Sequence, residues 1–295
     1  MAEYMSPSAE LSARVALEKH GFHHTHSLGQ NFLLDERLLT HLLDASEEPD
    51  GAENVLEIGP GAGVMTRLLA GRSRRVCALE LDRSLEPVLQ DVLSGLDNVD
   101  VIYEDAMKAD LAAIVREQFS GEPWRVVANL PYYITADVIL RLVTLSERPE
   151  SISIMVQKEA AERIMAQPGT KQWCALAATV QSYGEARVLM DIGPEAFDPP
   201  PHVMSRFICI RRYGVPPFAP KDERIYLRLI HAAFAMRRKT LANNLKAGFG
   251  LDNEAARRVL ADAGLDDRVR GEALTLTQLC RLADVLWERQ RRADT

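Results

Sequence analysis

Short apolar runs alternate with helix-like stretches between residues 54 and 156, and this alternation constrains the fold more than any other feature of the sequence. Runs of this kind, separated by segments with apolar residues every three to four positions, predict βαβ units. The α/β fold class then follows, with a mostly parallel sheet and helices on both faces. The predicted strands are Asn54–Ile58, Arg75–Leu81, Val99–Tyr103, Arg125–Ala128 and Ser151–Val156, and the predicted helices are Val64–Ala70, Ser84–Leu93, Leu111–Phe119 and Thr135–Leu145.

Two later strands and a set of helices complete the predicted layout. Glu185–Ile192 and Arg206–Tyr213 are typical of an antiparallel edge on such a sheet. The prolines between Tyr213 and Pro220 exclude a helix or a central strand, so this segment is predicted to be a linker. Only helical patterns follow it, at Glu223–Met236, Asn253–Ala263 and Thr277–Arg289. The predicted division is a flexible leader over 1–26, an α/β domain over 27–213, the linker over 214–220 and a small all-helical domain over 221–295.

Composition excludes several classes of protein. The chain has 295 residues, 47% hydrophobic and 26% charged, which is typical of a globular protein. Its four cysteines form no C-x-x-C pair, which argues against a zinc knuckle or a disulfide scaffold and favours a reducing cytosol. No apolar run approaches the roughly 18 residues of a membrane span. We therefore predict a cytoplasmic protein without a membrane segment. His20, His23, His24 and His26 could suggest a metal, but no cysteine or carboxylate accompanies them, so no metal site is predicted.

Charge is unevenly distributed along the chain. The net charge is −7, yet the window Ser205–Leu245 carries nine Lys/Arg against two acidic residues. A local basic zone of this kind indicates polyanion binding more directly than the total charge does. A solvated, arginine-rich helix face is the alternative, and charge alone leaves both open. The candidate polyanion-binding residues are Arg206, Arg237, Arg238 and Lys239.

Three predicted strand ends carry residues suited to an adenosine pocket. The first strand runs into Gly59-Pro60-Gly61-Ala62-Gly63, a turn that lets the backbone approach a ligand beside a helix N-terminus. Glu80 ends the second strand, where a carboxylate can accept hydrogen bonds from the two hydroxyl groups of a ribose. Asp105 follows the third strand and could accept a hydrogen bond from an adenine amino group. These residues leave NAD and S-adenosylmethionine equally open as cofactors.

The fourth strand ends in Asn129-Leu130-Pro131-Tyr132, which favours N-methylation of adenine. The exocyclic amine is a poor nucleophile, and two acceptors, Asn129 Oδ1 and the Leu130 carbonyl, can hold it as its nitrogen becomes tetrahedral, with Pro131 directing both. Tyr132 offers a flat face for stacking the base. No general base is required, because a sulfonium is a good leaving group and the barrier is mostly alignment. The cofactor predicted from this motif is S-adenosyl-L-methionine.

With these motifs in place, the sequence resembles the small-subunit ribosomal RNA adenine N6,N6-dimethyltransferases from about Ser27 to Leu286. The resemblance implies a class I, Rossmann-like methyltransferase domain that dimethylates two adjacent adenosines in the 3′-terminal hairpin of small-subunit RNA. It also implies that Asn31 and Leu33, with neighbouring Gln30, belong to the cofactor pocket, although from the residues alone this segment could simply lead into a helix near Asp35. The motifs that carry the resemblance are Gly29–Leu33, Glu57–Gly63, Glu80, Asp105, Asn129–Tyr132, Gln157–Arg163, Phe197–Val203 with Ser205, and Arg237–Leu241 with Asn243–Leu245.

Two further expectations concern aromatic residues. Phe197 precedes a rigid Asp-Pro-Pro-Pro run and is expected to form a second stacking wall opposite Tyr132, with a core aromatic as the alternative. Tyr133 stands where many members of the family carry Asn, and Ile192-Gly193-Pro194 replaces a more usual Val-Pro-Pro. Neither departure touches the implied chemistry.

The expected partner is small-subunit RNA or a precursor of the small ribosomal subunit, bound by a monomer. Three other functions compete with this interpretation. They are a large-subunit RNA methyltransferase conferring macrolide resistance, a catalytically idle RNA-binding assembly factor, and a NAD-dependent dehydrogenase. The last is the weakest, because the glycine spacing is one residue short of the dinucleotide fingerprint and no hydride-transfer histidine is placed.

Overall fold

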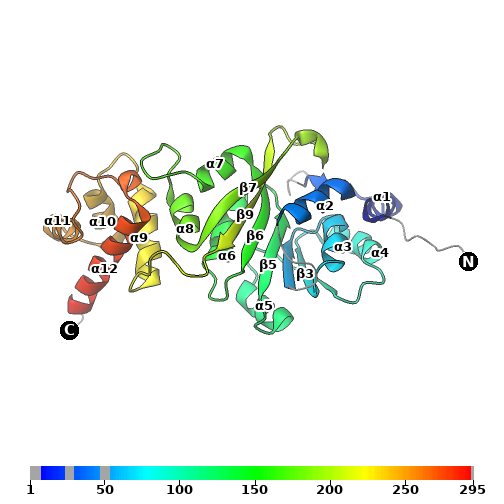
Figure 1. Cartoon of the computed structure of the whole chain (residues 1–295), viewed down its shortest axis with the longest axis horizontal. Helices are drawn as coiled ribbons and strands as arrows, with labels where there is room; N and C mark the ends of the chain where they lie inside the picture. The colour runs from blue at the N-terminus through cyan, green and yellow to red at the C-terminus, as the bar shows by residue number, and fades with distance from the viewer. Residues whose placement is uncertain (1–7, 24–29, 47–53, 294–295) are drawn as a thin grey trace, which may run out of the picture. The chain divides into compact units, whose positions relative to one another are not determined.

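A computed structural model describes residues 8–23, 30–46 and 54–293, and its first compact unit is built on a seven-stranded sheet. The strand order is β4-β3-β2-β5-β6-β9-β7 (Figure 1). All pairs from β4 to β6 are parallel, and β9 is antiparallel to β6, as the sequence predicts for this edge. The strands are β2 (Asn54–Ile58), β3 (Arg75–Glu80), β4 (Val99–Tyr103), β5 (Trp124–Asn129), β6 (Ser151–Gln157), β7 (Gly184–Ile192) and β9 (Ser205–Arg212).

The parallel register brings three strand ends together. Ile58, at the end of β2, lies opposite Leu79 of β3 on one side and Ala128 of β5 on the other. Strands β2, β5 and β6 are buried almost throughout, which explains why their sequences are continuous apolar runs rather than alternating ones. The chain order reverses between β2 and β5. In open α/β sheets, ligands bind outside the carboxyl ends of the strands at such a point.

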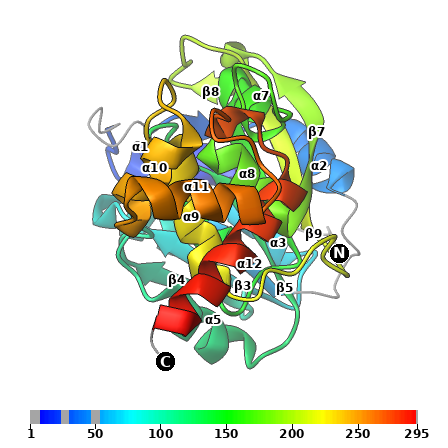
Figure 2. The ribbon, with the colours of Figure 1, turned by 90° about the vertical axis from the view of Figure 1, so that its left-hand side faces the viewer.

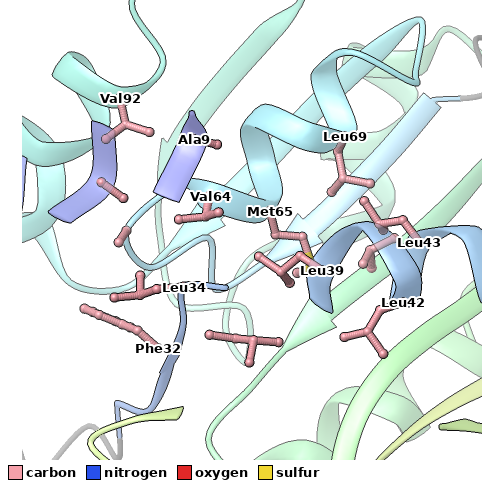
Figure 3. Close-up of a cluster of buried hydrophobic side chains, with 14 of the residues drawn as sticks. Ala9, Phe32, Leu34, Leu39, Leu42, Leu43, Val64, Met65, Leu69 and Val92 are labelled. Carbon is pink, nitrogen blue, oxygen red and sulfur yellow. The ribbon is translucent and has the colours of Figure 1, made fainter. Parts of the chain in front are cut away.

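Apolar side chains spaced three and four residues apart attach the helices of this unit to the sheet. In α2 (Glu36–Ala45), Asp35 caps the N-terminus by accepting from two backbone N–H groups, so the helix begins where the sequence suggested. Leu39 and Leu43 of α2 lie beside Met65 and Leu69 of α3, and Leu42 points away from α3 (Figure 3). The other helices on this sheet are α3 (Val64–Ala70), α4 (Glu86–Val92), α5 (Leu111–Phe119) and α6 (Thr135–Val143).

The predicted flexible leader is wrong for residues 8–23, because Ala9–Lys19 form helix α1. Its buried face consists of Ala9, Ala13 and Ala16, and the helix packs on α3 and α4. Small side chains allow this close approach, and a periodicity built on alanine gave little apolar signal in the sequence. Asp91 of α4 accepts from Lys19 Nζ at 2.6 Å and lies 2.8 Å from His20 Nε2. His24 and His26 lie outside the described residues.

The second compact unit comprises residues 162–185 and 213–295. Its helices α9 (Glu223–Ala235), α10 (Leu241–Phe249), α11 (Asn253–Asp262) and α12 (Leu276–Ala293) pack on one another, and α8 (Ala175–Tyr183) packs on α9 (Figure 2). The sequence predicted a helical domain that begins only after the linker, whereas the second unit also includes residues 162–185. The physical reason is Trp173, which is fully buried among these helices and donates from Nε1 to the Leu274 carbonyl at 3.2 Å.

Among the described residues, no helix combines the length and the apolar character that a membrane crossing requires.

Candidate active site

A pocket opens at the carboxyl ends of β2, β3, β4 and β5. Its volume is about 1060 Å³ when the space open to solvent is included. The structure brings all the predicted cofactor-binding residues to this one pocket. They are Gln30, Asn31, Leu33, Gly59, Gly61, Glu80, Asp105 and Asn129.

The glycine-rich turn after β2 forms the floor of the pocket. Gly59 and Gly61 have φ angles of +75° and +55°, in the left-handed region that side chains rarely adopt. A Cβ atom on Gly61 would also come within 3.1 Å of the Phe32 ring. Gly61 is therefore required both for its backbone conformation and for the packing of the segment Phe32–Leu33 (β1) against the turn.

Glu80 at the end of β3 holds this turn in place. Its carboxylate accepts from Gly61 N at 3.2 Å and from Asp82 N at 2.7 Å, one bond to each oxygen. The side chain is buried, and this burial raises its pKa, while the backbone groups of Asp82, Gly61 and Leu81 lower it. Each carboxylate oxygen has a second lone-pair position. Glu80 can thus accept two further donors, such as the hydroxyl groups of a ribose.

Asp105 and Gln30 occupy defined positions at the pocket wall. Asp105 Oδ1 accepts from Met107 N at 2.8 Å, and Lys108 Nζ lies 3.4 Å from Asp105 Oδ2. Gln30 Nε2 donates to Asp82 Oδ2 at 2.7 Å. Gln30 therefore ties the segment before β1 to the loop after β3, so that its side chain organises the pocket.

The turn after β5 is held with its acceptors available. Asn129 Nδ2 donates to the Asn31 carbonyl at 3.2 Å, and Oδ1 accepts no hydrogen bond from the described residues, so it is available to an incoming donor. Ile134 N donates to the Pro131 carbonyl at 3.2 Å and closes the turn. Within the described part of the chain, the Leu130 carbonyl receives no hydrogen bond. Two acceptors on adjacent residues are thus left at a pocket wall.

The two predicted stacking residues have different environments. Tyr132 lines the pocket and is half-buried, as stacking requires. Phe197 belongs to the two-residue strand β8 (Phe197–Asp198), which pairs with β1 so that Phe197 lies opposite Leu33. Its ring is 4% exposed within the apolar cluster and does not line the pocket. In this structure Phe197 is a core aromatic, because the pairing of β8 with β1 holds it in the apolar cluster, and it does not form the expected wall opposite Tyr132.

The four predicted RNA-binding cations are not equivalent. Arg206, in the first unit, donates from Nε to Asp191 at 2.7 Å. Arg237, in the second, donates to the Lys171 carbonyl at 2.6 Å and lies 3.5 Å from a Glu272 oxygen. Arg238 and Lys239 are exposed in the turn between α9 and α10, and their side chains make no hydrogen bond or ion pair with the described residues.

Several pocket residues were absent from the prediction. Each lies within two positions of a predicted site residue in the sequence, and this closeness was the signal that could have identified them. They are Leu81, Glu104, Ala106, Tyr133 and Ile134.

Glu57, on β2 just before the glycine turn, is fully buried. Burial raises its pKa to about 8; the neighbouring Thr66 hydroxyl lowers the pKa in part, and the Glu80 carboxylate raises it further. The carboxyl is therefore mostly protonated in the folded protein near neutral pH.

A pH-dependent stability follows from Glu57. Between its ordinary pKa of 4.5 and about 8, the folded state binds more protons than the unfolded state, so the free energy of unfolding falls as pH rises. The slope has an upper limit of about 1.4 kcal/mol per pH unit. Glu57→Gln, which cannot ionise, should gain stability relative to wild type as pH rises through this window. Urea unfolding of both proteins at pH 5.5, 6.5 and 7.5 measures the difference, and a difference independent of pH would contradict this environment for Glu57.

Comparison with known proteins agrees with this geometry. The family model described as ribosomal RNA adenine dimethylase matches residues 21–286. The chain is 42% identical over 274 residues to a protein named ribosomal RNA small subunit methyltransferase A from Geobacillus thermodenitrificans, covering 92% of this chain and 93% of the relative. It is also 42% identical over 277 residues to the protein of that name from Streptococcus pneumoniae, covering 92% and 95%.

Solved structures share the fold at lower identity. A dimethyladenosine transferase from Plasmodium falciparum is 21% identical with a TM-score of 0.69, and the match covers 87% of this chain and 96% of that one. The 23S rRNA methyltransferase ErmE is 24% identical with a TM-score of 0.62, covering 87% and 99%. These likenesses support the fold of the sheet and its helices. By the family model and by relatives that match nearly its whole length, the chain belongs to the ribosomal RNA adenine dimethylase family.

Proposed function

We propose that this protein transfers methyl groups from S-adenosylmethionine to N6 of adenosines in small-subunit ribosomal RNA, producing N6,N6-dimethyladenosine. The observation that carries the proposal is the pair of available acceptors, Asn129 Oδ1 and the Leu130 carbonyl, beside a pocket with a buried carboxylate at Glu80. The relatives named small subunit methyltransferase A, at 42% identity, support the RNA class. The large-subunit enzyme is 24% identical and supports only the fold.

The pocket residues fit S-adenosylmethionine. Glu80 has lone pairs left for two ribose hydroxyl groups, and Asp105, which also lines the pocket one strand further along the sheet, is the acceptor we assign to an adenine amino group. Gly61, whose missing Cβ leaves room for the Phe32 ring, keeps the glycine turn in its left-handed conformation beside the pocket. When bound, this cofactor supplies a methyl group on a positively charged sulfur, so the acceptor amine needs alignment more than it needs a base.

The turn Asn129–Tyr132 after β5, which we call the catalytic turn, provides that alignment. Asn129 Oδ1 and the Leu130 carbonyl accept from the N–H groups of the target amine and direct its lone pair away from the ring plane. The Asn31 carbonyl, which receives the Asn129 Nδ2–H, keeps the amide from turning its donor end toward the substrate. Tyr132 stacks on the displaced base, a contact of about 1–3 kcal/mol. An unpaired base in a loop reaches such a pocket at low energetic cost.

The direct test is methyl transfer in vitro. Purified protein, S-adenosylmethionine and small ribosomal subunits lacking the modification should yield N6,N6-dimethyladenosine, detected by mass spectrometry of RNA digests. Large subunits in the same assay serve as the discriminating substrate. Modification of large subunits alone would contradict the small-subunit assignment. Cofactor binding without transfer to either subunit would favour an assembly factor.

We further propose that Arg238 and Lys239 contact RNA phosphates, because both are exposed and unpaired among the described residues. Phosphate contacts release counterions, so affinity falls with salt at a log–log slope of roughly −0.7 per phosphate on single strands and −0.9 on duplex DNA. Arg238→Ala with Lys239→Ala should therefore make the slope shallower by about 1.4 to 1.8. Arg237 is left in place because it bonds the Lys171 carbonyl.

A matched control is available in the same unit. Arg257 and Arg258 of α11 are also exposed, but they pair with Asp267 and Glu254. Replacing both with alanine removes the same charge and should leave the slope nearly as in wild type. RNA binding across a salt series measures all three proteins. If the Arg238/Lys239 variant and wild type gave parallel lines, the phosphate contacts would lie elsewhere.

A further inference from the structure

A hydroxyl–hydroxyl contact joins the catalytic turn to a distant strand. The Tyr132 hydroxyl lies 2.5 Å from Ser205 Oγ, across 73 residues of sequence. Ser205 is fully buried, and it begins β9, opposite Gln157 at the end of β6. The preceding residue is also held, since the Met204 carbonyl accepts from Lys158 N at 3.0 Å. Ser205 is therefore a fixed point in the sheet.

The contact constrains the part of Tyr132 that the rest of the turn leaves free. Asn129 and Pro131 are tied through the Asn31 carbonyl and Ile134 N, and both ties act at the base of the turn. In the described chain, Ser205 supplies the only hydrogen bond to the far end of the Tyr132 ring. Because the hydroxyl lies on the long axis of the ring, this bond sets the direction of that axis and leaves rotation about it open.

The ring direction matters because Phe197 does not provide a facing wall. With Phe197 in the core, a base in the pocket has Tyr132 as its one stacking partner among the two aromatic residues predicted for that role. A stacked base follows the position of the ring beneath it. A shift of the ring therefore shifts the amine relative to the acceptors on Asn129 and Leu130, and a misplacement of about 1 Å can cost 100-fold in rate.

We propose that Ser205 is a positioning residue for methyl transfer, acting through its bond to the Tyr132 hydroxyl to aim the ring on which the target adenine stacks. This inference rests on the proposed function. It separates two roles of Tyr132, since the ring supplies the stacking surface and the hydroxyl supplies its direction.

A double-mutant cycle tests the proposal. Ser205→Ala and Tyr132→Phe should each lower kcat/KM for RNA by about 3- to 10-fold, the loss expected for one hydrogen bond. The double variant should be no worse than either single variant, because both changes remove the same bond. Ser205→Thr, which keeps a hydroxyl group, should recover most of the activity. The affinity for S-adenosylmethionine should stay within about two-fold of wild type in all variants.

The matched control is a chemically identical pair in the second unit. Ser182 Oγ lies 2.8 Å from the Tyr226 hydroxyl, and both residues are buried. Ser182→Ala should lower the melting temperature but leave kcat/KM unchanged. If Ser205→Ala also lowered only the melting temperature, or if the effects of Ser205→Ala and Tyr132→Phe multiplied, the positioning role would be wrong.

A binding assay distinguishes failure of this inference from failure of the proposed function. The target adenosine of an RNA hairpin is replaced with 2-aminopurine, whose fluorescence is quenched on stacking and which lacks the reacting amine. Wild type should quench the signal, and Ser205→Ala should quench it less at saturating protein. Equal quenching by the two proteins overturns the inference whether or not methyl transfer is observed. Absence of transfer by wild type, with quenching intact and sensitive to Ser205, would count against the proposed reaction only.

Discussion

Asn129→Ala should lower the rate of methyl transfer by about 100- to 1000-fold, the range observed when one preorganised polar group is removed from a transition state. The reason is the loss of Oδ1, one of two acceptors for the target amine. Among the described residues, the side chain makes one hydrogen bond, from Nδ2 to the Asn31 carbonyl, so its removal should leave the sheet intact. Single-turnover kinetics with saturating cofactor measures the effect on the chemical step, and the loss of cofactor affinity should be smaller than the loss of rate.

Asn98→Ala is the matched control for this substitution. Asn98 Nδ2 donates to two backbone carbonyls, Ala70 at 2.9 Å and Ser73 at 3.1 Å, and Asn98 does not line the pocket. Its replacement should destabilise the protein by about 1–3 kcal/mol while transfer continues at the wild-type rate. An equal loss of rate in the two variants would mean that Asn129 acts through the fold and that its acceptor role is wrong.

Glu80→Ala should weaken binding of S-adenosylmethionine by roughly 100-fold or more. Two bonds from ribose hydroxyl groups to a charged acceptor contribute about 1.5–3 kcal/mol each, and each 1.4 kcal/mol corresponds to ten-fold in affinity. In wild type, Gly61 N donates to the Glu80 carboxylate. The variant removes this hydrogen bond, so the glycine turn is also held less firmly. Isothermal titration calorimetry measures the affinity. Glu147→Ala, which removes an exposed ion pair with Arg116 outside the pocket, should leave the affinity for S-adenosylmethionine unchanged.

The raised pKa of Glu80 also leads to a prediction of how cofactor affinity depends on pH. Burial raises the pKa of this carboxyl above its ordinary value of 4.5, and the carboxylate form is the one that accepts the ribose hydroxyl groups. Affinity should therefore fall as pH decreases, beginning at a higher pH than an exposed glutamate would give. Glu80→Gln should bind more weakly and should not show this pH dependence. Unchanged affinity in a folded Glu80→Ala protein would contradict the assignment of the pocket.

The pocket could be predicted from the sequence because it is built at strand ends. Glu80, Asp105 and Asn129 each end or directly follow an apolar run, and parallel strands present their carboxyl ends at one edge of the sheet. Local periodicity therefore located both the strands and the polar residues after them. The cap at Asp35 was predictable for the same reason, since a helix start depends on a few consecutive residues.

Contacts between distant segments could not be predicted in this way. Phe197 is turned into the core by pairing of β8 with β1, and Trp173 joins its segment to the C-terminal helices through Leu274. Arg237 looked equivalent to Arg238 in the sequence, yet only its guanidinium reaches the Lys171 carbonyl. Each of these outcomes depends on which surfaces meet after the chain folds. The identity of the neighbouring residues in the sequence does not indicate which surfaces these are.

The sequence by itself determined the α/β class, the strand runs and the chemistry of the strand ends, because those properties depend on residue type and on spacing within about ten positions. The tertiary structure alone decided that α1 packs on α3 and α4, that Phe197 lies in the core and not at the pocket, and that Ser205 meets the Tyr132 hydroxyl. The physical reason is that burial and hydrogen-bond pairing are properties of two surfaces in contact, and here the partners lie tens of residues apart in the chain.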